Sequence, residues 1–546
     1  MRASPLDPWC DLPLEPRLEL ALKAVRAGDL DGYKKLAAAG GVAVMIHGRQ
    51  ALQVHREAPP GEAWEPYRLA GVFEYGDWQR IDEEPWSPEA RATLEKWREV
   101  LLAPLESNAA DPGIARLQHD NLLFAGEARQ ARQCLIRTSK QASPWGSVPM
   151  TQRLAGYLRL EETVMLAWAE MVAGRLAHSA ALAQRADKLG PPEDQQHVSA
   201  TDLLAFLQLA RGQSQHAKLG APAMLAGPRG PAPLDTCLWL LELCLLSALV
   251  EPNALEERAQ TARAIAARLG SPRLIAIAEA WRSAARLTVG DDPGPSTEVA
   301  AQLRLIPSSA RGLRALPLFV SGVANRRSDH LGESARLARA TGQGWLEVAA
   351  LAWLVHLGAE RVGRGLHRLL QVSGWRAPML VPRNVHADVA TRLAAGGERS
   401  VAVIEFALAS RDEKAVLSVA SAHLRDEACA SEVYETAASA LARVGRPEAR
   451  ELLRAVASSR AAAAPAAAAA LAHRNERLGL STRESDVLRL AADGRTNSQI
   501  AAALTISPHT VARHLENSRN KLGAANRAEA VALWLTSRDR PGPVGG

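Results

Sequence analysis

At 546 residues the chain is too long for a single hydrophobic core, which predicts several domains or a small domain joined to a repeat array. Its net charge is +6, and residues 474–540, with eleven Lys and Arg against seven Asp and Glu, account for +4 of it. Five scattered cysteines without a Cys-x-x-Cys pair speak against a disulfide framework and a cysteine zinc site. The start of the chain has no apolar signal-like region, and the longest apolar run, near residues 239–250, is too short to cross a bilayer. A cytoplasmic protein without membrane contact is therefore expected.

The first 150 residues are expected to be mostly helical, and their fold type stays open. Apolar residues spaced three to four apart, with a break at Gly28, predict a helix, a tight turn and a second helix over residues 12–38. Residues 41–54 are ambiguous, because their apolar residues alternate as they would in a short β-hairpin. The helical spacing predicts further helices over residues 67–77, 88–105, 115–137 and 151–189.

Residues 151–459 show helix pairs that recur about every 30–45 residues, a period typical of an α-solenoid of tetratricopeptide type. The clearest pair lies within residues 162–189, where Gly174 separates two stretches with small residues at the positions where two helices must approach. Similar pairs are predicted over residues 238–269, 271–289, 345–372 and 401–454.

An alanine-rich tract, residues 460–473, follows the repeats and contains Pro465. Proline inside a helix removes a hydrogen-bond donor and kinks the helix, and alanine side chains are too small to build a core. We therefore interpret the tract as a linker between the repeats and the C-terminal domain.

Residues 474–540 predict a small four-helix domain, followed by a disordered tail, residues 541–546. The first helix is expected to begin with a capping box of Ser481 and Glu484, and the second with a capping box of Thr496 and Gln499.

The third helix of this domain is expected to begin at the proline after Ser507 and to end at Gly523. Val511 and Leu515 lie one turn apart and face the core, which turns Arg513 outward. A fourth helix is predicted over residues 527–535.

Residues 480–531 resemble the four-helix DNA-binding domain of the LuxR-type transcriptional regulators of bacteria. The residues that carry the resemblance are Leu480, Ser481, Arg483, Glu484, Thr510, Val511, His514, Lys521, Leu522 and Gly523. The resemblance implies that residues 508–522 form the recognition helix. It also implies that a two-fold contact between two copies on DNA involves the fourth helix.

This chain departs from the family pattern at two places. Ser518 and Arg519 stand where the family has an apolar pair, which predicts looser packing at the end of the recognition helix. Ala512 stands where a lysine is common, which makes Arg513 the expected base reader.

The resemblance implies groove-facing roles for Thr510, Ala512, Arg513 and Glu516, and phosphate contacts from Ser498, Thr510 and Lys521. The local excess of positive charge suits such contacts, because neutralising phosphates releases counterions. The full set of expected DNA-binding residues is Thr496, Asn497, Ser498, Ser507, His509, Thr510, Ala512, Arg513, Glu516, Asn517, Lys521 and Arg527.

Residues 346–358 and 407–450 are similar to the helical repeats of the large ATP-binding LuxR-type regulators. The nucleotide-binding module of those regulators is not expected here, because the sequence has no Gly-x-x-x-x-Gly-Lys-Ser/Thr loop to hold phosphates. No ATP hydrolysis is therefore expected.

We find no sequence pattern for catalysis, for a metal site or for a cofactor, so a protein that is not an enzyme is expected. The sequence has neither a His-Glu-x-x-His nor a Gly-x-Ser-x-Gly motif. Trp168, Trp239, Trp281 and Trp353 lie in helical stretches and are expected to be packing residues, with a ligand pocket lined by them as the alternative.

The sequence thus predicts an all-α protein, a tetratricopeptide-like α-solenoid followed by a DNA-binding domain. The expected function is sequence-specific transcription regulation, with repeats that sense an effector or dock a protein. Double-stranded DNA, RNA polymerase and a second copy on DNA are the expected partners. The alternative is a solenoid scaffold whose terminal domain binds protein, and the outward-facing Arg513 and Lys521 speak against it.

Overall fold

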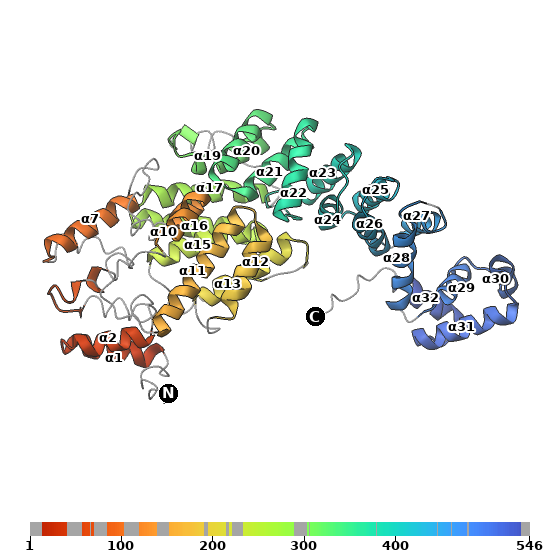
Figure 1. The fold of residues 1–546 in the computed structure, drawn as a ribbon, viewed down its shortest axis with the longest axis horizontal. Coiled ribbons are helices and arrows are strands. Elements are labelled where there is room, and N and C mark those ends of the chain that lie inside the picture. Colours follow the sequence, from red (N-terminus) through yellow and green to blue (C-terminus); the bar gives the residue numbers. More distant parts are fainter. Residues whose placement is uncertain are drawn as a thin grey trace. The chain divides into compact units, whose positions relative to one another are not determined.

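The computed structural model describes residues 14–40, 57–65, 67–69, 85–102, 119–138, 152–189, 195–213, 218–220, 233–288, 303–304, 306–377, 379–444, 446–459, 461–477 and 480–536. These residues form helices and turns and no β-strand, so the fold is all-α, as predicted (Figure 1). None of the helices in these ranges is long and apolar enough to cross a membrane. The chain divides into two compact units, Met1–Val385 (unit 1) and His386–Gly546 (unit 2).

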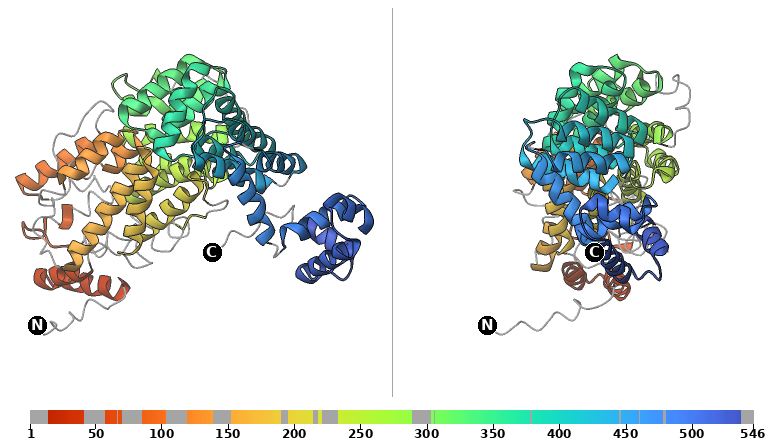
Figure 2. Two further views of the ribbon diagram at one scale, coloured as in Figure 1. Left: turned by 45° about the vertical axis from the view of Figure 1, so that its right-hand side comes forward. Right: turned by 90° about the vertical axis from the view of Figure 1, so that its right-hand side faces the viewer.

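Helix pairs joined by short turns build much of unit 1, and their stacking can be followed in Figure 2. The helices of this unit are α1 (Leu14–Arg26), α2 (Leu30–Gly40), α7 (Pro88–Leu102), α9 (His119–Phe124), α10 (Ala128–Thr138), α11 (Gln152–Val172), α12 (Leu176–Asp187), α13 (Gln195–Ala210), α15 (Pro233–Ser247), η1 (Pro252–Ala254), α16 (Leu255–Arg268), α17 (Pro272–Thr288), α19 (Arg311–Ala324), α20 (Ser328–Thr341), α21 (Gly344–His356), η2 (Glu360–Val362) and α22 (Gly363–Ser373). A further helix, α23 (Arg383–Ala395), spans the boundary between the units.

The predicted pairs over residues 12–38 and 162–189 are confirmed as α1 with α2 and as α11 with α12. The prediction of a pair over residues 271–289 is wrong, because this stretch forms the single helix α17. No glycine or proline interrupts the stretch after Pro272, so nothing in it breaks the helix. The ambiguous residues 41–54 lie outside the described ranges.

Two ranks of helix pairs in unit 1 meet at their turns, although they are far apart in the sequence. In the turn before α10, a Glu127 side-chain oxygen accepts a hydrogen bond of 3.0 Å from the backbone N–H of Gly312, which lies 185 residues later. Arg129 donates to the carbonyl oxygen of Ala340 at 3.2 Å. The contacts of residues 125–129, 173–174 and 210 with residues 312, 340–344 and 376–377 are called the turn seam below.

Glycines make the turn seam possible, because backbone meets backbone there. A Cβ atom on Gly344 would lie 2.4 Å from the carbonyl oxygen of Ala173, and one on Gly312 would lie 2.4 Å from that of Ala125. Further along the seam, the N–H groups of Arg376 and Ala377 donate to the carbonyl oxygen of Ala210 at 2.7 and 2.9 Å. Unit 1 therefore differs from a simple solenoid, in which each repeat contacts only its neighbours.

Several of the described tryptophans of unit 1 pack in its interior, whereas Trp353 is half-buried. Trp168, Trp239 and Trp281 are buried, as expected for packing residues. Trp281 stacks on Trp345 with ring centroids 5.6 Å apart, and the cavity beside them measures only about 20 Å³. A cavity of this size holds no more than about one water molecule, so this tryptophan pair does not line a ligand pocket.

Unit 2 continues the helix pairs and ends in a four-helix domain. Its helices are α24 (Val401–Ser410), α25 (Glu413–Leu424), α26 (Ser431–Val444), α27 (Pro447–Ala457), α28 (Ala464–Arg477), α29 (Thr482–Ala492), α30 (Asn497–Leu504), α31 (Pro508–Leu522) and α32 (Arg527–Thr536).

The alanine-rich tract differs from the linker that we expected. It forms helix α28, which packs on α26 and α27, and the side chains of Ala463 and Ala467 are buried. Pro465 lies in the first turn of this helix, where a missing N–H leaves no intrahelical hydrogen bond unmade. The proline therefore begins the helix instead of kinking it.

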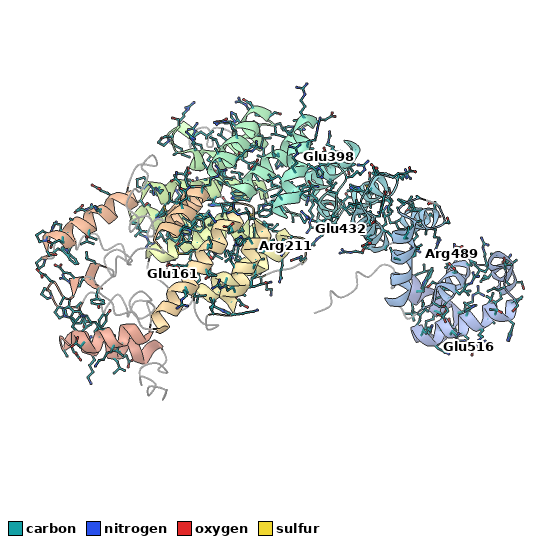
Figure 3. All side chains as sticks on the ribbon, viewed as in Figure 1. Glu161, Arg211, Glu398, Glu432, Arg489 and Glu516 are labelled. Atoms are coloured by element: carbon teal, nitrogen blue, oxygen red, sulfur yellow. The ribbon has the colours of Figure 1, made fainter. Side chains whose placement is uncertain are left out.

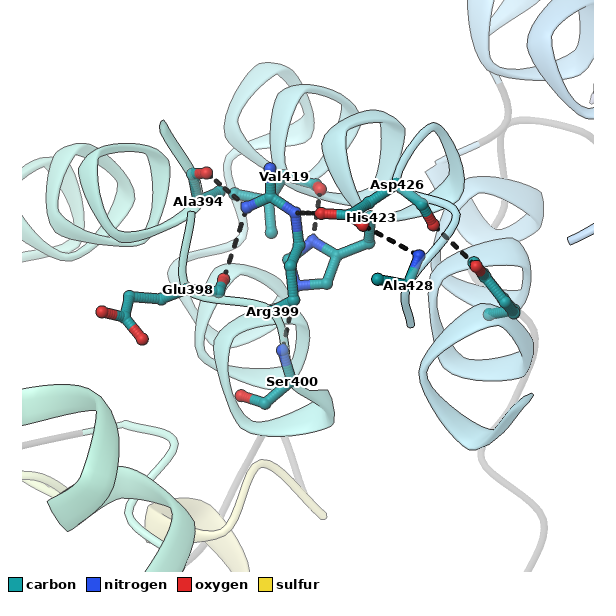
Figure 4. A network of polar contacts seen from close by, with 9 residues as sticks. Ala394, Glu398, Arg399, Ser400, Val419, His423, Asp426 and Ala428 are labelled. Atoms are coloured by element: carbon teal, nitrogen blue, oxygen red, sulfur yellow. Dashed lines mark hydrogen bonds and ion pairs between the residues drawn. The ribbon is translucent and has the colours of Figure 1, made fainter. Parts of the chain in front are cut away.

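A polar network joins the turn before α24 to the end of α25 (Figure 4). The fully buried His423 donates from Nδ1 to the carbonyl oxygen of Val419 at 2.7 Å and accepts at Nε2 from the backbone N–H of Ser400 at 3.2 Å. Beside it, Arg399 forms an ion pair of 3.1 Å with Asp426. His423 therefore ties the end of α25 to the start of α24 through Nε2, while Nδ1 bonds within α25 itself.

Candidate nucleic-acid interface

Helices α29 to α32 form a small domain around one hydrophobic core, which we call the reading domain (residues 480–536). Every helix of the domain contributes to this core. Its buried residues are Leu480, Val487, Leu488, Leu490, Ala491, Ile500, Ala501, Val511, Leu515, Ala524, Ala530 and Trp534.

Both predicted capping boxes are confirmed. The Ser481 N–H donates to Glu484 at 2.6 Å, and the Glu484 N–H donates to the Ser481 hydroxyl at 3.2 Å. The Thr496 N–H donates to Gln499 at 2.9 Å, and the Gln499 N–H donates back at 3.4 Å. These bonds satisfy N–H groups that a helix end otherwise leaves unpaired.

The recognition helix expected from the sequence is α31, and its start is confirmed. The Ser507 hydroxyl accepts from the N–H of Thr510 at 3.1 Å and lies 2.7 Å from the Thr510 hydroxyl. Val511 and Leu515 are buried, whereas Arg513 is exposed on the other side of the helix. The apolar face thus fixes which side chains α31 presents to solvent.

The turn between α30 and α31 contains a feature that we did not predict. Thr505 has a φ of +55°, and its N–H donates to the carbonyl oxygen of Ala501. A β-branched residue is uncommon in this left-handed conformation, where glycine or asparagine is the usual signal. The sequence carries no such signal here.

Most of the expected DNA-binding residues are on the surface of the reading domain. Glu516, labelled in Figure 3, projects from α31. Asn497, Thr510 and Arg527 are half-buried. The exposed members of the set are Thr496, Ser498, Ser507, His509, Ala512, Arg513, Glu516, Asn517 and Lys521.

Lys521, expected to contact a phosphate, is engaged within the domain. Its ammonium donates to the buried carboxylate of Glu484 at 2.7 Å, which ties the end of α31 to the start of α29. Burial by itself raises the pKa of the Glu484 carboxyl, but the Lys521 ammonium and the Ser481 donors outweigh burial and hold the pKa below its ordinary value of 4.5.

We expect Glu484→Gln to lower the free energy of unfolding of the reading domain by about 1.5–3 kcal/mol, the range for hydrogen bonds to charged groups. Because the folded state holds the pKa of Glu484 down, this carboxylate stabilises the fold above its ordinary pKa of 4.5 and loses the effect as the pH falls below it. Urea unfolding at pH 7 and pH 3 measures both effects. If the free energies of unfolding of wild type and variant differ by the same amount at pH 7 and pH 3, the ion pair is contradicted.

Two further members of the expected set contact each other. Arg527, at the start of α32, donates from Nη1 to the Asn497 side-chain oxygen at 3.0 Å and from Nη2 to the carbonyl oxygen of Arg495. Arg513, by contrast, makes no hydrogen bond or ion pair with any residue that the structure describes.

The looser packing expected at the end of α31 stays a prediction. Ser518 is fully buried, and its hydroxyl donates to the carbonyl oxygen of His514 at 2.7 Å. The buried hydroxyl thus has a hydrogen-bond partner within its own helix.

Comparison with known proteins supports the interpretation of this domain. Residues 478–534 match the family described as "Bacterial regulatory proteins, luxR family". The "Probable transcriptional regulatory protein SgaR" of Hyphomicrobium methylovorum is 51% identical over 57 residues, which are 10% of this chain and 27% of that protein. The "HTH-type quorum sensing-dependent transcriptional regulator VjbR" of Brucella abortus (strain 2308) is 46% identical over 57 residues, 10% of this chain and 22% of that protein.

The "Nitrate/nitrite response regulator protein NarP" of Escherichia coli (strain K12) is 44% identical over 59 residues, 11% of this chain and 27% of that protein. The similarity therefore covers about a quarter of each of these relatives. With the fold and the caps described above, these matches identify the C-terminal domain as a helix-turn-helix domain of the LuxR family. The relatives are described as regulators of transcription and not as enzymes.

Proposed function

We propose that the protein is a sequence-specific DNA-binding transcriptional regulator. The observation that carries the proposal is the outward face of α31, where Ala512, Arg513 and Glu516 are exposed opposite the buried Val511 and Leu515. A short helix that presents such residues beside a tight turn fits the major groove of DNA. The family match of residues 478–534 supports the same role.

We assign Ser498 and Thr510 to contacts with the DNA backbone. Ser498 lies in the first turn of α30, and Thr510 lies in the first turn of α31. Helix N-termini favour phosphate, because their unpaired N–H groups point at the ligand. Phosphate contacts position the domain, whereas base contacts specify the sequence that it reads.

The helical repeats are proposed to sense an effector or to dock a partner protein, with RNA polymerase as a further partner. In this organisation residues 1–150 and 151–459 precede the DNA-binding domain of residues 474–540. Stacked helix pairs create extended surfaces that suit the binding of proteins and ligands. The chain acts in this scheme as a binding protein without enzymatic activity.

Selection of DNA duplexes from a random-sequence pool by the full chain tests the proposed function. Enrichment of one shared sequence supports a specific regulator. Absence of duplex binding even at low salt would contradict DNA binding and favour the alternative, a scaffold whose terminal domain binds protein, because backbone contacts dominate affinity under those conditions.

Arg513→Ala is expected to weaken binding to the selected sequence by about 1–3 kcal/mol, with little effect on a random duplex, because a base contact carries sequence information. Fluorescence anisotropy with the two duplexes measures both affinities. The exposed Arg443 on α26 provides the control, and Arg443→Ala should change neither affinity. An equal loss on both duplexes from Arg513→Ala would make Arg513 a phosphate contact.

Two copies are proposed to bind an inverted repeat with half-sites about 10 base pairs apart, since one recognition helix reads only a few base pairs. Helix α32 supplies the two-fold contact in this proposal, and Ala532, Leu533 and Leu535 are exposed on it. Ala532→Glu should place like charges across the two-fold axis and weaken cooperative binding.

Gel-shift titration with half-site and full-site DNA measures this cooperativity. Ala492→Glu, at an exposed alanine at the end of α29, is the matched control. Equal affinity per half-site for the wild-type chain on both DNAs would mean that the copies bind independently.

A further inference from the structure

Arg527 joins two helices of the reading domain that the sequence separates. Its Nη1 donates to the side-chain oxygen of Asn497, which lies 30 residues earlier in the sequence, at 3.0 Å. Its Nη2 donates to the carbonyl oxygen of Arg495. Both acceptors flank Thr496, the residue that caps α30. The arginine thus holds the turn that leads into α30 from both sides of the cap.

The start of α32, which carries Arg527, is itself held by hydrogen bonds. The Asn526 side chain accepts from the N–H of Glu529 at 2.8 Å, and the Glu529 carboxylate accepts from the N–H of Ala525 at 2.8 Å. Helix α32 also packs against α31 and α29. A planar guanidinium on a fixed helix end is well suited to hold two acceptors at once.

These contacts distinguish Arg527 from Arg513, although both were expected to contact DNA. Arg513 is exposed and makes no hydrogen bond or ion pair within the described part of the chain, whereas Arg527 is half-buried and two of its nitrogens are engaged. A cation whose donors already have partners in the protein has fewer left for a phosphate.

We infer that Arg527 is a positioning residue, which orients the start of α30 toward the DNA backbone without contacting DNA itself. The inference rests on the proposed function. Because Arg527 begins the helix proposed to join two copies, it also links that helix to the part of α30 that holds phosphate. Arg527 then connects the helix proposed to pair two copies with the helix proposed to bind the DNA backbone.

Comparison of Arg527→Lys with Arg527→Gln tests the inference in the full chain. Lysine keeps the positive charge, so its ammonium can replace an arginine that contacts a phosphate. It cannot replace the planar guanidinium that donates to two acceptors at once. For a positioning residue both variants should weaken binding by a similar factor, about tenfold, on a duplex selected by the wild-type chain. The slope of log affinity against log salt should stay unchanged in both.

The opposite pattern would overturn the inference. If Arg527→Lys binds like the wild-type chain while Arg527→Gln loses about 0.9 from the salt slope, Arg527 contacts a phosphate directly. Asn497→Ala combined with Arg527→Lys should cost little more than Arg527→Lys alone, because Arg527→Lys already removes the hydrogen bond to Asn497. Full additivity of the two losses would show that the two side chains act separately. Arg443→Gln on α26 controls for the loss of one surface charge.

Hydrogen exchange of the free chain gives an answer that does not depend on DNA. Both Arg527 variants should speed exchange at the amides of Gln499 and Ile500, which donate to Thr496, while amides at the core of α31 keep their protection. Unchanged exchange at α30 would contradict the positioning role even if affinity falls. A wild-type chain that binds no duplex would contradict the proposed function, and the exchange result would still show whether Arg527 holds this turn.

Discussion

Gly344→Ala is expected to lower the free energy of unfolding of unit 1 by about 3 kcal/mol, which is large for the addition of one methyl group. The new Cβ atom would lie 2.4 Å from the carbonyl oxygen of Ala173 and 2.9 Å from the Cα atom of Gly174. These are backbone atoms, so no side chain can move aside to relieve the contact. The two ranks of helix pairs must separate locally, and the hydrogen bonds of the turn seam weaken with them.

Gly365→Ala is the matched control, because Gly365 lies in the exposed part of α22 and a Cβ there meets nothing within 4 Å. This change should stabilise the protein by about 0.5–1 kcal/mol, since alanine is the better helix former. Urea unfolding monitored by hydrogen exchange measures the stability of unit 1 and of unit 2 separately. A Gly344 variant as stable as the wild type would show that the turn seam adapts without loss.

Ala512→Glu is expected to reduce DNA affinity by about 100-fold while it leaves the core of the reading domain intact. Ala512 is exposed next to Arg513 on the face proposed to enter the groove. A carboxylate there faces the phosphates and cancels the charge of its neighbour. Glutamate favours the helix, so the fold itself should persist.

Ala512→Lys places a positive charge where Ala512→Glu places a negative one. It should strengthen binding to duplexes of any sequence and make the affinity fall more steeply with salt. Anisotropy titrations of both variants at two salt concentrations measure these effects, and circular dichroism confirms that the helices remain. Equal affinities of the glutamate and lysine variants would place this face of α31 away from the DNA.

The parts of the reading domain that could be predicted are those in which neighbours in the sequence bond to each other. The capping boxes join residues three apart, so the types of Ser481 and Glu484 suffice to predict them. The apolar spacing of α31 likewise predicts its buried face. Thr505 was missed because a threonine gives no sign of a left-handed turn.

Contacts between distant residues could not be predicted in the same way. Lys521 meets Glu484 across 37 residues, and Arg527 meets Asn497 across 30. We expected Lys521, Arg527 and Asn497 to contact DNA, because the sequence does not show which polar groups meet after folding. The turn seam was missed for the same reason, since Gly312 and Gly344 resemble ordinary turn glycines until their distant neighbours are known.

The turn seam also has a consequence for how unit 1 forms during synthesis. An open repeat array folds by adding each pair to the one before it, so early pairs need nothing from later ones. Here Glu127 finds its partner Gly312 only 185 residues later. At roughly 5–20 residues per second, a ribosome takes on the order of 10–40 seconds to supply it. During that interval the early turns expose backbone that the finished protein covers.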